Sequence, residues 1–148
     1  MLNFIEKDGN YQINVTERDL TICDPCCPND GEAIRLALGQ WQLCPIYRES
    51  CFGSIIDGWQ LTNLAAAVAD AYPETYFVGT DTGLVALVED NFSWSERKKD
   101  ILTFRDVAGA GQDWLALCTG GDGTFRVTVD FNEYGEAVAI NIPADFWI

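Results

Sequence analysis

Alternation of apolar and polar residues, the pattern of a half-buried β-strand, occurs near both ends of the chain. Residues 11–15 alternate in this way after an Asp-Gly pair at 8–9 that favours a tight turn, so a hairpin with residues 4–5 on its first strand is expected. Residues 126–131 alternate as well, with Val and Phe on one face. These and shorter apolar runs predict strands at 20–23, 75–78, 84–88, 114–118, 124–131 and 137–142.

A stripe of apolar residues at helical spacing predicts one long helix at about residues 57–72. Leu61, Leu64 and Ala65 begin the stripe, which continues at i+7 and i+8 and would form one face of a helix. Pro73 would end that helix, because proline cannot supply the next backbone N–H.

Three segments carry weaker patterns. A shorter helix is predicted at about 94–104, where Ser93 and Glu96 have the spacing of a capping box. Residues 32–43 fit a strand or a helix, and a strand is favoured because a glycine at position 39 weakens a helix. Residues 107–112 are rich in Gly and Ala and are expected to form a loop.

Length and composition support one folded domain over residues 1–148. The chain is 48% apolar, which argues against disorder, and no apolar run is long enough for a membrane span. No signal peptide is evident, so a cytoplasmic location is expected. The predicted fold is α+β: a mainly antiparallel sheet with the long helix and the shorter one.

Charge and the lack of histidine exclude several functions. Nine Lys and Arg residues stand against 23 Asp and Glu residues, which gives a formal net charge of −14. Such a surface should repel phosphate backbones, so direct nucleic-acid binding is not expected. Because the chain has no histidine, Ser-His and Cys-His nucleophile pairs are impossible. No spacing of carboxylates identifies a catalytic pair either, and the protein is predicted not to be an enzyme.

The carboxyl-terminal third has a modest excess of negative charge because it contains few basic residues. From residue 106 onward there are seven acids and one base. Carboxylates on alternating strands, together with an exposed aromatic anchor, would suit a basic protein partner, although the same charge could serve solubility alone. The oligomeric state is open. The candidate partner-binding residues are Asp122, Asp130, Glu133, Tyr134 and Glu136.

Cysteines are concentrated in the first third, where five of the six lie between residues 23 and 51. Cys23 and Cys26 form a Cys-x-x-Cys pair, and with Cys44 and Cys51 they could supply the four thiolates of a structural zinc site. The wide spacing of the second pair weakens this interpretation. Reduced thiols without a metal are favoured over it, and a disulfide is a further alternative. Zinc is the one cofactor that the sequence suggests.

Asp81-Thr82-Gly83 resembles the Asp-Thr-Gly motif of retroviral-type aspartic proteases. That family brings two such loops together so that two carboxylates share a proton. Only one copy occurs here, and polar residues precede it instead of apolar ones. A turn between two strands is therefore the favoured interpretation.

The carboxyl half resembles bacterial toxin-immunity proteins of the SMI1/KNR4-like (SUKH) group. The resemblance rests on a strand and Gly-rich turn at 113–123, a strand ending in Asp at 124–130, a Gly-containing turn into a strand at 134–138, and the Tyr-Pro-Glu-Thr-Tyr run at 72–76. It implies an α+β protein that binds and neutralises a toxin, often a nuclease.

A non-catalytic immunity protein that neutralises a basic toxin or nuclease is therefore the expected function. Two alternatives stay open. One is a phage-encoded inhibitor of a host defence nuclease that mimics the charge of DNA. The other is an interaction module stabilised by a metal bound to the cysteines.

Overall fold

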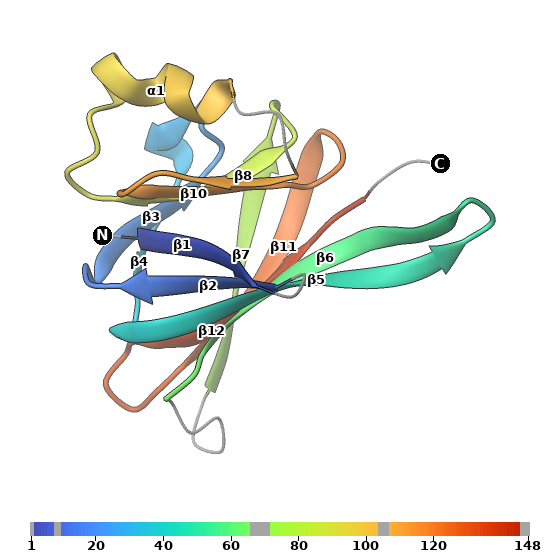
Figure 1. Ribbon diagram of the computed structural model, residues 1–148. Coiled ribbons are helices and arrows are strands. Elements are labelled where there is room, and N and C mark those ends of the chain that lie inside the picture. Colours follow the sequence, from blue (N-terminus) through green and yellow to red (C-terminus); the bar gives the residue numbers. More distant parts are fainter. Residues whose placement is uncertain (1, 8–9, 66–71, 104–106, 146–148) are drawn as a thin grey trace.

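The computed structural model describes residues 2–7, 10–65, 72–103 and 107–145, which form two antiparallel sheets and one short helix (Figure 1). The larger sheet has seven strands in the order β1 (Leu2–Lys7), β2 (Asn10–Val15), β5 (Gly39–Ser50), β6 (Gly53–Asn63), β12 (Ala137–Pro143), β11 (Gly123–Phe131) and β7 (Tyr72–Thr80). The smaller has five, in the order β4 (Glu32–Arg35), β3 (Asp19–Cys23), β8 (Leu84–Glu89), β10 (Trp114–Cys118) and β9 (Ala108–Ala110).

The two sheets bury one apolar core between them. On β11 the side chains of Phe125, Val127 and Val129 are buried, whereas Arg126 is exposed and Thr128 is half-buried. This is the burial pattern that the alternating sequence predicts, because successive side chains of a strand point to opposite faces. Trp41 and Trp59, from β5 and β6, are the largest side chains of this core.

Strand β8 is buried at all six positions because it is covered on both faces. Val85 and Leu87 belong to the core between the sheets. Ala86 and Val88 point the other way and pack in a second cluster with Ile101 of helix α1 (Trp94–Leu102). Figure 1 shows α1 lying over β8 and β10, so the molecule has three layers: larger sheet, smaller sheet and helix.

The long helix predicted at 57–72 is wrong. Strand β6 continues to Asn63, and β7 begins at Tyr72; residues 66–71 lie outside the described part of the chain. Leu61 is 2% exposed, whereas Leu64 is 53% exposed, although a helix would place both on one face. Pairing of β6 with β5 on one side and β12 on the other overrides the local helical stripe.

The shorter helix is confirmed, as α1 over Trp94–Leu102 within the predicted 94–104. The capping box is wrong: the Ser93 side chain makes no capping hydrogen bond, and the Ser93 carbonyl accepts the Arg97 N–H at 2.8 Å. The strand preference at 32–43 is confirmed by β4 and β5. The loop expected at 107–112 instead contains the short strand β9, which pairs with β10.

The α+β prediction is thus correct only in part: the fold is mostly antiparallel β, with one short helix among the described residues. None of the helical structure in the described ranges has the length and apolarity that crossing a membrane would need.

Candidate functional site

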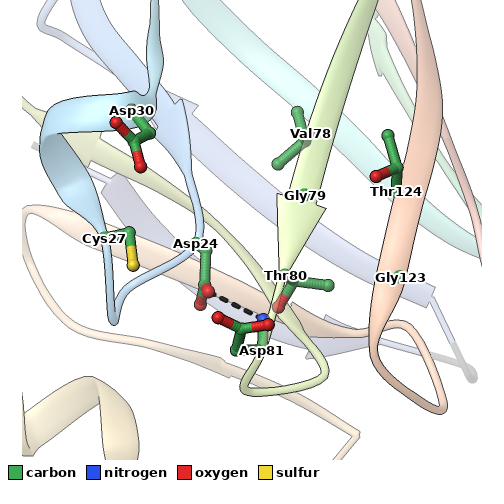
Figure 2. Close-up of a pocket in the computed structure, with 9 residues that line it drawn as sticks. All are labelled: Asp24, Cys27, Asp30, Val78, Gly79, Thr80, Asp81, Gly123 and Thr124. Carbon is green, nitrogen blue, oxygen red and sulfur yellow. Dashed lines mark hydrogen bonds between the residues drawn. The ribbon is translucent and has the colours of Figure 1, made fainter.

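A cleft of about 340 Å³ lies between the β3–β4 loop and the end of β7 (Figure 2). It is lined by three carboxylates, from Asp24, Asp30 and Asp81, and by the Cys27 thiol. Cys27 and Asp30 belong to the β3–β4 loop, and Asp81 follows β7. Among the described residues no Lys or Arg lines the cleft, so its walls are acidic.

Asp24 ties the two walls of the cleft together. Its side chain is 4% exposed, and one carboxylate oxygen accepts the Asp81 backbone N–H at 2.8 Å, drawn as the dashed line in Figure 2. The other oxygen accepts the Thr82 hydroxyl at 2.6 Å and the Cys26 N–H at 3.2 Å. A buried carboxylate is therefore held by neutral donors from both loops, which fixes their separation.

The Asp81-Thr82-Gly83 segment forms a turn between two strands, as the sequence predicts. The strands that it joins belong to different sheets, since β7 lies in the larger sheet and β8 in the smaller. The Thr80 hydroxyl oxygen accepts the Thr82 and Leu84 N–H groups, both at 3.2 Å. Gly83 has a φ of +72°, the left-handed region that favours glycine. The turn is thus internally bonded and leaves the exposed Asp81 carboxylate facing the cleft.

Asp24, Cys27 and Asp81 each offer a possible ligand atom, and these atoms lie within 4.8 Å of one another. The chemistry of the set argues against a thiolate metal centre. Hydrogen bonding to Cys26, burial, and the negative charges of Asp24 and Asp30 raise the pKa of the Cys27 thiol, which disfavours the thiolate that a soft metal ion needs as a ligand. Both oxygens of Asp24 are already engaged. The cleft is better suited to an organic cation than to a soft metal ion.

The structure does not bring the four cysteines of the predicted zinc site together. Cys23 is buried on β3, and burial raises the pKa of its thiol to about 12. Cys26 is exposed in the following loop, whereas Cys44 and Cys51 belong to the long β5–β6 hairpin of the other sheet (Figure 1). Within the described ranges, no group of three or more of these cysteines has its sulfur atoms close enough to hold one ion. All six cysteines are free thiols.

The five predicted partner-binding residues are divided between the two ends of β11. Asp122 is exposed in the loop before this strand. Asp130, Glu133, Tyr134 and Glu136 lie at its far end, about 30 Å away at ~3.3 Å per residue. They do not form one surface, because β11 runs the length of the sheet between them.

The far end of β11 is also partly neutralised. The Glu136 carboxylate lies 3.2 Å from the Arg18 guanidinium. Tyr134 is 74% exposed, and a hydrogen bond to Glu133 raises the pKa of its hydroxyl. An aromatic anchor is thus present there, but the carboxylate beside it is paired within the molecule.

Most described arginines are similarly paired with acids away from the cleft. Arg35 lies 4.0 Å from Asp19, Arg48 lies 3.2 Å from Asp57, and Arg97 contacts both Asp100 and Asp113. These arginines therefore do not neutralise the cleft. Lys98 Nζ donates to the Cys26 carbonyl at 3.2 Å on the outside of the β3–β4 loop, but it does not line the cleft, whose negative field can attract an external cation.

Sequence reasoning missed this cleft. Asp24 stood out only as part of the Cys-x-x-Cys run, and Asp81 only as the first residue of an Asp-Thr-Gly motif interpreted as a turn. The available signal was that acidic residues follow two predicted strands, 20–23 and 75–78. The packing of the two sheets decides which strand ends lie side by side, and the positions of acidic residues in the sequence do not reveal that packing.

A scan against protein-family models finds no match, and searches of curated proteins and of solved structures find no significant similarity to this chain.

Proposed function

We propose that this is a non-catalytic binding protein whose acidic cleft receives a basic side chain of a protein partner. The observation that carries the proposal is the convergence of Asp24, Asp30 and Asp81 on one cleft of about 340 Å³, which no basic residue lines in the described part of the chain. An ammonium or guanidinium group entering it would gain charge-assisted hydrogen bonds from the exposed carboxylates of Asp30 and Asp81.

The charge of the whole chain supports a macromolecular partner. A net charge of −14 attracts basic proteins over long distances and raises their association rate, while the cleft supplies a defined contact at the end of the encounter. Asp24 contributes by holding the loops in place, so the cleft exists before the partner arrives.

The specific form of this proposal is an immunity protein that neutralises a basic toxin or nuclease. It rests on the resemblance of the carboxyl half to the SUKH group and on the acidic cleft. A cleft that fits single basic side chains favours an immunity protein over a mimic of DNA, because a mimic would use an extended row of carboxylates.

The test is capture of a partner by the immobilised protein from a lysate of its source organism, followed by calorimetry with the partner identified. Binding of a basic protein should be strong at about 50 mM NaCl and weak at about 500 mM, because salt screens exposed charges. The double variant D30N/D81N should weaken binding by at least about tenfold.

The matched control is D90N/E96Q, which removes two exposed charges from the other end of the smaller sheet and from α1. Both double variants change the net charge equally. Equal weakening by the two would show that only overall charge matters, and the cleft would lose its proposed role.

A further inference from the structure

A second hollow, of about 270 Å³, lies beside the acidic cleft along the same strand. It is bounded by β4 on one side and by the first half of β7 on the other, with Phe131 of β11 at its base. Its lining combines the aromatic rings of Tyr72, Tyr76 and Phe131 with the charged groups of Glu74 and Arg35. We call it the aromatic groove.

The aromatic groove follows from the unequal lengths of two edge strands. Tyr72, Glu74 and Tyr76 are alternate residues of β7 and therefore share one face. Strand β4 has only four residues, Glu32–Arg35, and leaves this part of the larger sheet partly uncovered. Tyr72 is consequently 45% exposed, although it lies directly opposite the buried Phe131 in the strand register.

The rings are arranged as a cluster with a carboxylate at its side. The Tyr72 and Phe131 rings stack with centroids 5.7 Å apart, and the Tyr76 ring meets Phe131 edge-on at 6.4 Å. The Tyr76 hydroxyl donates to Glu74 Oε2 at 3.0 Å. Aromatic faces beside a carboxylate attract cations, and the base that lines the groove, Arg35, lies within 4.0 Å of Asp19.

Both sites lie along one strand edge. The aromatic groove uses Tyr72 to Tyr76 of β7, and the acidic cleft uses Val78 to Asp81. The aromatic groove lies between β7, which ends the larger sheet, and β4, which ends the smaller one. The acidic cleft continues along β7 beside the β3–β4 loop, and we call the two sites together the seam. An edge strand presents unpaired backbone groups to which an extended peptide can add.

We propose that a basic segment of the partner lies extended in this seam, pairs with the edge of β7, and places one cationic side chain in each site. This inference rests on the proposed function and specifies the form of its ligand. Glu74 and Thr80 mark the two sites on one face of β7 and are six residues apart. Six residues of strand span about 20 Å, so the partner carries Lys or Arg at positions i and i+6.

Charge complementarity selects this occupant over a second copy of the chain. Two copies with a net charge of −14 repel each other, whereas a basic segment is attracted by both sites.

The probes for the test are synthetic peptides of nine residues, built on alternating Thr and Val. One peptide carries Arg at i and i+6, an isomer of identical composition carries them at i and i+3, and a third carries a single Arg. Calorimetry with the full-length protein should show the i, i+6 peptide binding at least about fivefold more tightly than its isomer.

Variants of the protein test whether the second Arg of the peptide binds in the aromatic groove. E74Q and Y72L should each weaken the i, i+6 peptide by about three- to tenfold and leave the single-Arg peptide nearly unchanged. Y47L/E49Q is the matched control, because Tyr47 is 58% exposed on the remote β5–β6 hairpin. Binding should also slow hydrogen exchange of β7 amides, and backbone N-methylation of the peptide should abolish this protection.

The outcomes separate the two proposals. Equal affinity of the isomers, or binding insensitive to E74Q and Y72L, overturns the extended-segment inference while leaving the acidic cleft intact if D30N/D81N still weakens the natural partner. Failure of every peptide to bind, together with capture of that partner unaffected by D30N/D81N, overturns both.

Discussion

At the scale of single residues, the chain neighbours Cys23 and Asp24 are both buried but have different roles. Cys23 ends β3 with its thiol in the apolar layer under α1, and Asp24 turns into the loop with its carboxylate buried but fully hydrogen-bonded. Both are nearly inaccessible, yet only Asp24 connects two loops. The acidic cleft therefore depends on one residue for its shape and on Asp30 and Asp81 for its accessible charge.

Replacement of Asp24 by alanine should lower the free energy of unfolding by about 1–3 kcal/mol, because the partly buried Asp81 N–H and Thr82 hydroxyl would lose their acceptor. Urea denaturation measures the change. D30N, at an exposed carboxylate of the same cleft, should change stability by less than about 0.5 kcal/mol. Similar losses in the two variants would contradict the role assigned to Asp24.

Cys23 should make the protein sensitive to alkaline pH. Burial, with a smaller effect of Asp24, raises the pKa of its thiol from 9.0 to about 12. Between these values the unfolded chain has released the thiol proton and the folded chain has kept it, so the free energy of unfolding falls as pH rises. In C23A this group no longer titrates, and the alkaline decline should be shallower.

Denaturation midpoints measured from pH 8 to pH 11 test this expectation, with exposed Cys51 providing the control variant C51A. Tyr76, whose pKa is raised to about 12 chiefly by burial, titrates over a similar range and adds to the slope in every variant. Parallel profiles for C23A and the unsubstituted protein would show that Cys23 does not carry the effect.

At the scale of elements, most strands form where the local apolar–polar pattern predicts them. Strand β6 is an exception, because pairing with its neighbours determines its conformation. Strand β6 has a sequence that also suits a helix, but it lies between β5 and β12 and hydrogen-bonds to both. Helix α1, by contrast, has its apolar Ile101 fully buried against the smaller sheet, and its Arg97 lies over the Phe92 ring at 4.9 Å. Whether each segment forms a strand or a helix therefore depends on the elements that it packs against or pairs with.

Two leucines distinguish the strand from the helix that the sequence predicted. Leu61→Ala should destabilise the protein by about 2–4 kcal/mol, because the side chain is 2% exposed in the core. Leu64→Ala should cost less than about 0.5 kcal/mol, because that side chain is 53% exposed. In a helix both would lie on the buried face, so comparable losses in chemical denaturation would favour the helix.

At the scale of the whole molecule, excess negative charge is the main electrostatic feature. The ion pairs of the described arginines are mostly at partly exposed sites, where each contributes about 0–1 kcal/mol. Repulsion among the remaining carboxylates acts on the compact state as a whole. The same field that we assign to partner capture should therefore work against folding.

Adding salt should consequently stabilise the isolated protein. The urea midpoint is expected to rise as NaCl is increased from about 50 to about 500 mM, because the shorter Debye length screens repulsion. D30N/D81N, which removes two of the uncompensated charges, should show a smaller rise. A midpoint that falls with salt would mean that the surface ion pairs outweigh the repulsion.

The strand assignments were accessible from sequence because alternation is a local signal that burial on one face imposes directly. The acidic cleft was not, since Asp24 and Asp81 are 57 positions apart and meet only through their hydrogen bond. The cysteines of the predicted zinc site are separated for a related reason, because Cys23 and Cys44 lie on strands of different sheets.

What the sequence determined by itself is the set of short strands, the shorter helix, and the acidic, histidine-free character of the surface. These follow from side-chain periodicity and composition, which need no knowledge of neighbours. Tertiary structure alone decided that residues 57–63 are a strand, that β7 and β8 separate into different sheets, and that three distant carboxylates face one cleft. The reason is physical: hydrogen bonding and burial between strands far apart in the chain select one arrangement from several that are locally acceptable.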